Sequence, residues 1–190
     1  MTVHDRLGFA LSGADADSAE DYETGLAALQ RFAGDPIGAV ERALAASPGF
    51  VMAHVLKGWL YGLATEPDAT RVAQGALVQG QWHQAGLLLE DLSIDMPRDA
   101  LALQAGHQID FFTGNARMLR DRIARALPAW DAAMPGYHAM LSAHAFGLEE
   151  TGDYARAEAS GRHAVELEPR DGWGQHAVAH VMEMQSRQAD

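Results

Sequence analysis

The sequence contains no cysteine. A chain without cysteine forms no disulfide bonds and no cysteine-ligated zinc site, and it cannot use a thiol as a catalytic nucleophile. It also has no apolar run that approaches the roughly 18 residues that a membrane-spanning helix needs. The first residues, MTVHDRLGFALSG, lack the basic start and the long apolar core of a signal peptide. We therefore predict a cytoplasmic protein.

Positive charge is scarce as well. The 14 Lys and Arg are outnumbered by 26 Asp and Glu, which gives a formal net charge of -12. Nucleic acids and anionic membrane surfaces both bind clustered Lys and Arg, so we expect neither as a partner. Glycine-rich phosphate loops and the catalytic patterns Ser-x-x-Lys and Gly-x-Ser-x-Gly are also missing, which disfavours an enzyme. No cofactor is expected.

Signals for β-strands are missing too. No segment of four or more residues alternates convincingly between apolar and polar side chains, and Val, Ile and Thr are few while Ala is abundant. This composition predicts an all-α fold. Hydrophobic residues make up 48% of the chain, enough for a continuous core. We expect order over 18–190 and a partly ordered segment at 1–17.

The most informative pattern is the stretch GDYARAEASGRHAVELEPRD at 152–171. Gly152 is followed at fixed distances by Ala157, Ala164 and Pro169. Weaker copies of this frame begin at Gly34, Gly80 and Gly114. Recurrence at about 34 residues is typical of tetratricopeptide (TPR) arrays of helical hairpins. The pattern predicts one TPR-like α-solenoid over 18–190, a right-handed superhelix of about nine to ten helices.

Caps and breakers give the expected helix limits. Ser18 and Asp21 resemble a capping box, and Asp35, Asp99 and Asp171 are suitable N-caps. The expected helices are 18–32, 36–46, 50–64, 67–79, 82–95, 99–113, 115–127, 136–151, 153–167 and 171–187. Small residues at the expected helix crossings are Gly58, Ala73 and Ala179.

The region at about 64–80 does not fit the repeat. The frames at Gly34 and Gly80 are 46 residues apart, whereas the later intervals are 34 and 38 residues. This interval holds one helix more than a hairpin repeat allows, and an odd helix would invert every later repeat. Either 67–79 is irregular or a helix is missing here.

Four stretches resemble the tetratricopeptide repeat protein 38 family. They are PGFVMAHVLKGWL at 48–60, PRDALAL at 97–103 leading to His107, LRDRIARALPAW at 119–130, and AFGLEETGDYARAE from 145 through HAVAHVMEM at 176–184. The resemblance implies an α-helical repeat fold and brings no established catalytic activity. Family members are usually longer, so the chain resembles roughly their N-terminal half. They also tend to have a longer segment between the counterparts of Leu63 and Gly80, which again suggests a missing helix.

The repeat frame predicts which side chains line a concave groove. On the helix expected at 171–187, His176, His180 and Glu183 share one face, with Trp173 one turn earlier. The full set of groove candidates is Met52, His54, Trp59, Gln104, His107, Gln108, Ser142, Phe146, Glu149, Trp173, His176, His180 and Glu183.

Several histidines and arginines have two interpretations. His176, His180 and Glu183 have a spacing at which they can ligate a divalent metal ion. The plainer interpretation is a partly buried histidine pair hydrogen-bonded to adjacent helices and to Glu183. His54 and His107 are expected to bond backbone carbonyls where hairpins cross. Four arginines fall within nine residues, namely Arg117, Arg120, Arg122 and Arg125. They form either a cationic site for a carboxylate or phosphate, or a solvated helix face balanced by Asp121 and by acidic neighbours such as Glu149 and Glu150.

Two functional hypotheses follow. The first is a non-catalytic scaffold that presents a groove to a protein or peptide partner. Its groove has His, Gln and Glu in place of Lys and Arg, so we do not expect acidic peptide tails as the ligand. The alternative is a metal- or small-molecule-binding enzyme centred on His176, His180 and Glu183. The helix at 171–187 also lacks a second hairpin member to cover Val178, Val181 and Met182, and we expect it to fray or to form a homodimer.

Overall fold

The computed structural model describes residues 2–63 and 82–189. Within these residues it has nine α-helices, one 3₁₀ turn and no β-strand. The expected all-α class is therefore confirmed for the described part of the chain. These residues fall into two compact units, one containing Gln30–Ala33 and the chain from Trp82 onward, the other containing the remainder. No helix in the described part is long and apolar enough to cross a membrane.

The first unit contains α1 (Ala16–Arg31, whose last two residues belong to the second unit), α2 (Pro36–Ala46) and α3 (Val51–Leu63). Asp35 caps α2 as expected, since its carboxylate accepts a hydrogen bond of 2.8 Å from the Gly38 amide and Pro36 occupies the first turn. The core of this unit includes Val40 and the rings of Tyr22 and Phe50, whose centroids are 5.2 Å apart.

The expected capping box of α1 is wrong by one turn. The N-cap is Asp15, whose carboxylate accepts from the Ser18 amide at 2.8 Å. The Ser18 hydroxyl in turn accepts from the Asp15 amide at 3.0 Å. Ser18 is thus the third helical residue and completely buried, so α1 begins two residues before the expected start at 18. Each of these two hydrogen bonds needs a side-chain acceptor, and the sequence Asp-x-x-Ser supplies both.

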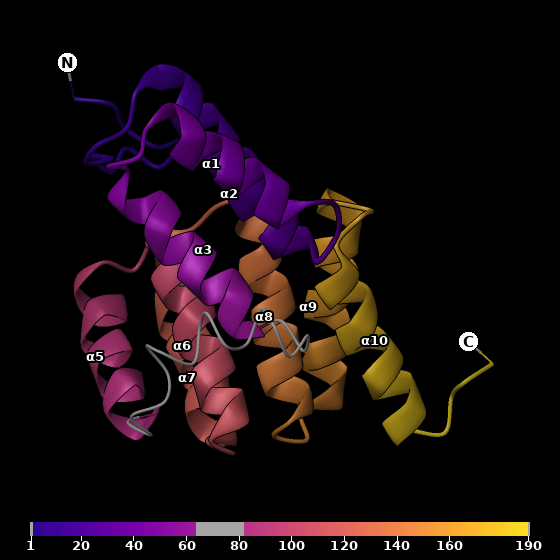
Figure 1. Cartoon of the computed structure of the whole chain (residues 1–190). Coiled ribbons are helices and arrows are strands. Elements are labelled where there is room, and N and C mark those ends of the chain that lie inside the picture. The colour runs from indigo at the N-terminus through magenta and orange to yellow at the C-terminus, as the bar shows by residue number, and fades with distance from the viewer. Residues whose placement is uncertain (1, 64–81, 190) are drawn as a thin grey trace. The chain divides into compact units, whose positions relative to one another are not determined.

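The second unit contains α5 (Trp82–Asp95), α6 (Ala100–Phe112), α7 (Ala116–Ala126), α8 (Tyr137–Glu149), α9 (Tyr154–Leu167) and α10 (Gly172–Met184). Each helix packs against the next one along the chain, and α10 also packs against α8 (Figure 1). Asp99 and Asp171 are N-caps, as the sequence predicted. Expected and observed helix limits differ by at most three residues here. The helix expected at 67–79 lies outside the described residues.

Turn glycines recur at the starts of helices. Gly34, Gly114 and Gly152 have φ angles of +94°, +71° and +82°, a left-handed region that other residues rarely adopt. Each precedes an Asp or Asn at the N-cap of the next helix. Three of the four predicted repeat starts therefore coincide with helix starts, and the fourth, at Gly80, lies outside the described residues.

Close helix crossings occur at glycines that the sequence analysis did not select. A Cβ atom added at Gly147 of α8 would lie 2.6 Å from the Arg120 Cα of α7, and one at Gly161 of α9 would lie 2.8 Å from Val178 of α10. Among the described residues, a Cβ added at Gly58 would meet no atom within 4 Å, and Ala179 is exposed. The expectation for Ala179 is wrong, that for Gly58 is not met within the described part of the chain, and Ala73 lies outside it. Crossing positions depend on which helix faces meet, and the repeat frame alone does not give this.

Candidate binding site

A continuous row of rings runs through the second unit, and Phe146 of α8 is near its centre. The centroid of Phe146 is 5.4 Å from that of Phe111, 5.8 Å from Trp173 and 6.0 Å from His180. We call the whole row the aromatic belt, and each of its rings is within 6.1 Å of the next: Trp82, Phe112, Phe111, Phe146, His180, His176, Trp173 and Phe32. Most of these rings come from α6, α8 and α10.

The belt has a buried centre and exposed ends. Phe146 is only 4% exposed, whereas Phe111, Phe112 and Phe32 are 45%, 56% and 68% exposed. Large apolar side chains that stay in contact with water are costly when they gather in one place, and such patches mark binding surfaces. The belt is thus anchored in the core and has exposed aromatic surface at Phe111, Phe112 and Phe32.

His107 links α6 to α8 beside the belt. Its Nε2 atom donates a hydrogen bond of 2.9 Å to the carbonyl oxygen of Ala143. Burial, with a smaller contribution from Arg122, lowers the pKa of His107 to about 4. The imidazole is therefore neutral at pH 7. The expected role for His107, a bond to a backbone carbonyl across helices, is confirmed.

The rings of His176 and His180 are neighbours on α10, with centroids 4.2 Å apart and planes tilted by 49°. The nearest carboxylate is that of Glu149 on α8, whose Oε2 is 3.6 Å from His180 Nδ1. Burial raises the pKa of Glu149, and the neighbouring Glu150 adds to this effect. Burial lowers the pKa of His176, and His180 lowers it further. Two imidazoles this close disfavour a second positive charge.

The expected partnership of this pair with Glu183 is wrong. Glu183 is exposed on α10, whereas Glu149 reaches the pair from α8. Across residues 2–63 and 82–189, no group of three or more His, Asp or Glu side chains is placed to hold a metal ion. The alternative metal site at His176, His180 and Glu183 is therefore not assembled.

Ser142 takes part in the cap of α10 and not in the belt. Its hydroxyl donates to Asp171 Oδ2 at 2.7 Å, and His138 Nδ1 donates to the same oxygen at 2.6 Å. The other Asp171 oxygen accepts from the Gly174 amide at 2.8 Å. A nucleophilic serine instead needs its hydroxyl hydrogen-bonded to an imidazole that can remove its proton. The Ser-His-Asp composition here is thus a helix cap.

The remaining candidates divide between the two units. Gln104 and Gln108 of α6 are buried and line a small cavity beside Phe146 and Trp173. Met52, His54 and Trp59 lie on α3 in the first unit, so the belt contains none of them. The ring of His54 donates to the Pro48 carbonyl at 2.8 Å, a local bond that does not join two hairpins.

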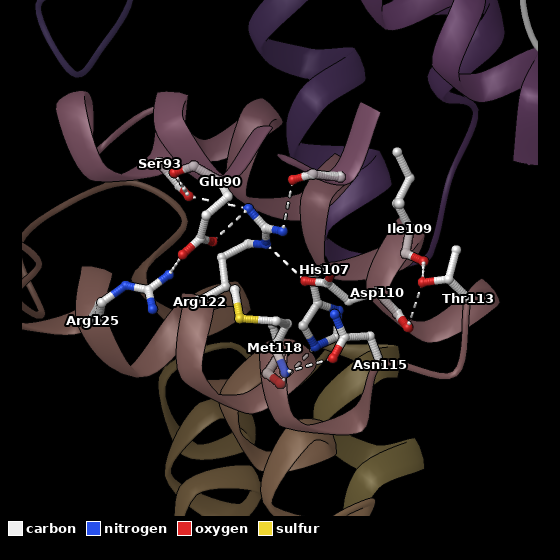
Figure 2. A network of polar contacts seen from close by, with 12 residues as sticks. Glu90, Ser93, His107, Ile109, Asp110, Thr113, Asn115, Met118, Arg122 and Arg125 are labelled. Atoms are coloured by element: carbon white, nitrogen blue, oxygen red, sulfur yellow. Dashed lines mark hydrogen bonds and ion pairs between the residues drawn. The ribbon is translucent and has the colours of Figure 1, made fainter. Parts of the chain in front are cut away.

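Three of the α7 arginines, Arg120, Arg122 and Arg125, are paired with acids, and one of the three is buried. Arg122 is 1% exposed and is the centre of a buried network (Figure 2). Its Nε donates to Asp110 at 2.9 Å, and its Nη1 lies 3.1 Å from Glu90 and donates to Ser93 at 3.2 Å. Burial raises the pKa of Asp110, although Arg122 opposes the effect.

The other α7 arginines lie at the surface. Arg120 pairs with the adjacent Asp121, and Arg125 with Glu90. The expected balance by Asp121 is confirmed for Arg120. The expected balance by Glu149 is wrong, because Glu149 lies beside His180 of α10. The signal for Arg122 was present in the sequence, since it shares the i, i+3, i+4 face of buried Leu119, Ile123 and Ala126.

Phe111, Phe112 and Phe32 are the residues of the belt that the sequence analysis missed. Phe32 follows the end of α1 and contacts Trp173 at 5.1 Å. No periodic pattern marks it, and only the fold brings it to α10. Phe111 and Phe112 follow directly after an eleven-residue run, 100–110, in which every residue is buried. Because this run has no alternation between buried and exposed positions, hydrophobic periodicity does not show that the two rings after it are exposed.

No protein-family model matches the chain, and no solved structure matches it.

Proposed function

We propose that the second unit is a peptide-binding module, whose ligand lies along the aromatic belt. The observation that supports this most is the exposure of Phe32, Phe111 and Phe112 in one row with buried Phe146. Aromatic residues are enriched at protein interfaces, and a few of them usually supply most of the binding energy. The ligand is a protein or peptide segment, with nucleic acid and membrane excluded by the charge of -12.

The arrangement of helices that fits this function is a TPR-like solenoid. Turn glycines followed by an N-cap residue recur at Gly34, Gly114 and Gly152, and in that frame α6, α8 and α10 are the first helices of successive hairpins. First helices line the groove of such arrays, and these three supply most of the belt. We therefore propose a cytoplasmic TPR-like scaffold. We also propose that it is related to the tetratricopeptide repeat protein 38 family, which its sequence resembles.

A random peptide library displayed on phage tests the binding module. Selection on the wild-type protein is expected to enrich peptides that lose binding to the Phe111→Ala/Phe112→Ala variant. Leu87→Ala/Leu88→Ala is the matched control, because these α5 leucines are 68% and 64% exposed and are not in the belt. Failure to enrich any peptide, or equal loss in both double variants, would contradict the proposal.

We also propose that the protein forms a homodimer through α10. The surface involved differs from the expected one, which included Val181. Val181 is fully buried, in a cluster with Leu148 and Ala157, because it faces α8 and α9. The outer surface of α9 and α10 instead has a groove of about 380 Å³ whose apolar residues are Val165, Val178, Ala179 and Met182. Light scattering is expected to show a dimer that Met182→Asp converts to a monomer. A monomeric wild-type protein would contradict this proposal.

A further inference from the structure

A small cavity lies beside the aromatic belt and is lined in part by two belt rings, Phe146 and Trp173. Its volume is about 20 Å³. The side chains that define its chemistry are Gln30, Gln104, His107, Gln108, Phe146 and Trp173. A water molecule needs about 10–15 Å³ by this measure. The cavity therefore accommodates one group of about the size of a water molecule.

One acceptor in this cavity has no partner from the chain. Gln104 is 8% exposed, and its Oε1 atom is buried with no hydrogen-bond partner among the described residues. A buried acceptor without a donor has lost its hydrogen bonds to water and gained none in return, which is unfavourable. A group that enters the cavity thus gains free energy by donating a hydrogen bond to this oxygen.

The cavity wall carries no net charge. Among the described residues that line it there is no Lys, Arg, Asp or Glu. His107 is neutral at pH 7, and its Nε2–H is already given to the Ala143 carbonyl. A carboxylate or an ammonium group entering here would lose its hydration with no opposite charge to replace it, which is far more costly than burying a neutral polar group. The wall therefore disfavours charged guests of both signs.

We infer that the cavity binds a Ser or Thr hydroxyl of the peptide ligand and that Gln104 selects this side chain. The hydroxyl is the peptide side-chain donor closest in size to one water molecule, and it is neutral. Phe146 and Trp173 line the cavity and also belong to the belt, so a peptide that lies along the belt brings its side chains to the cavity. This inference rests on the proposed peptide-binding function and specifies its ligand.

Two substitutions at one position separate the possible guests. Gln104→Met keeps the side-chain length and removes the acceptor. Gln104→Glu keeps the acceptors and adds a negative charge. Gln175→Met is the control, because Gln175 is exposed on α10 and its amide donates to the Pro169 carbonyl outside the cavity. Circular dichroism first confirms that each variant is folded.

The experiment is phage selection of random peptides on the wild-type protein and on each variant. We expect Ser or Thr at one fixed position for the wild type and for Gln175→Met. We expect Lys or Arg there for Gln104→Glu and apolar residues for Gln104→Met. For one selected peptide, replacing the hydroxyl residue by Ala should weaken binding about tenfold with the wild type and less than about twofold with Gln104→Met.

The outcomes distinguish this inference from the proposed function. Peptides that depend on Phe111 and Phe112 but show no Ser or Thr preference would overturn the hydroxyl pocket alone. So would the same preference in all Gln104 variants, which would leave only a water in the cavity, or an Asp or Glu preference in the wild type. Failure to select any belt-dependent peptide would overturn both.

Discussion

Replacing His107 by Gln tests whether a buried neutral imidazole opposes folding in acid. The ring is 7% exposed, and its Nε2–H donates to Ala143 at 2.9 Å. Glutamine has a similar length and keeps an N–H donor, but it does not titrate. The substitution therefore removes the proton equilibrium and leaves the hydrogen bond.

The magnitude follows from the two pKa values of His107. Burial lowers its pKa from 6.5 to about 4, so the unfolded chain takes up the proton first as the pH falls. Between about pH 6.5 and pH 4 the unfolded state binds more protons than the folded state, and folding stability decreases as the pH decreases. The loss reaches about 2.5 kcal/mol near pH 4.5 and about 3 kcal/mol at lower pH.

The assay is urea unfolding of the wild type and of His107→Gln at about pH 7 and about pH 4.5. Contributions from all other titrating groups cancel in the difference between the two proteins. We expect the free energy of unfolding of the variant, relative to the wild type, to improve by about 2.5 kcal/mol on going to pH 4.5. His83→Gln, on an exposed histidine of α5, is the control and should show no such change. If the difference in unfolding free energy between His107→Gln and the wild type changes by less than about 0.5 kcal/mol between the two pH values, the reasoning is refuted.

Two further predictions concern helix packing. In thermal melts, Gly147→Ala should destabilise the protein by about 1–3 kcal/mol, because its Cβ would lie 2.6 Å from the Arg120 backbone. In the same melts, Gly58→Ala should stabilise the protein by about 0.5–1 kcal/mol, because the added Cβ meets no described atom within 4 Å. Equal effects would contradict the crossing geometry. Arg122→Met should cost about 3–5 kcal/mol in urea unfolding near pH 7, because it leaves Asp110 buried without its cation. Adding Asp110→Asn should recover part of that loss, and a loss that stays unchanged would show that packing, not charge, is responsible.

Helix positions were predictable because their signals are local. Asp99 and Asp171 each follow Pro-Arg, and a short acidic side chain there both ends the extended segment and accepts from an amide three residues on. The turn glycines were predictable for the same reason. The start of α1 was not, because Asp15 and Ser18 both can act as cap and the sequence does not say which one begins the helix.

The candidate site was only partly predictable. The α10 face with Trp173, His176 and His180 follows from helical spacing, and the structure joins these rings to Phe146. The carboxylate beside the histidines did not follow, because Glu149 belongs to another helix and Glu183 only shares the spacing. Contacts between helices depend on crossing angles and axial offsets, which a repeat frame leaves open.

The partners of Arg122 show the limit most clearly, although its place on the buried face of α7 could be read from the sequence. Arginine is almost never buried unless it is paired, and the spacing of the four α7 arginines suggested a solvated face. Its burial depends on Asp110 from α6 and Glu90 from α5 being placed opposite it. It also depends on Gly106, where a Cβ would come within 2.7 Å of the guanidinium. Asp110, Glu90 and Gly106 do not belong to any sequence motif that includes Arg122.

The most direct test of the central claim is the affinity of one selected peptide for three proteins, measured by fluorescence anisotropy. The claim is that the aromatic belt binds a peptide through exposed Phe111 and Phe112. Losing two interface rings costs at least about 1.4 kcal/mol, so we predict at least a tenfold weaker Kd for Phe111→Ala/Phe112→Ala. Leu87→Ala/Leu88→Ala should bind as the wild type does. Unchanged affinity in the phenylalanine variant would contradict the account.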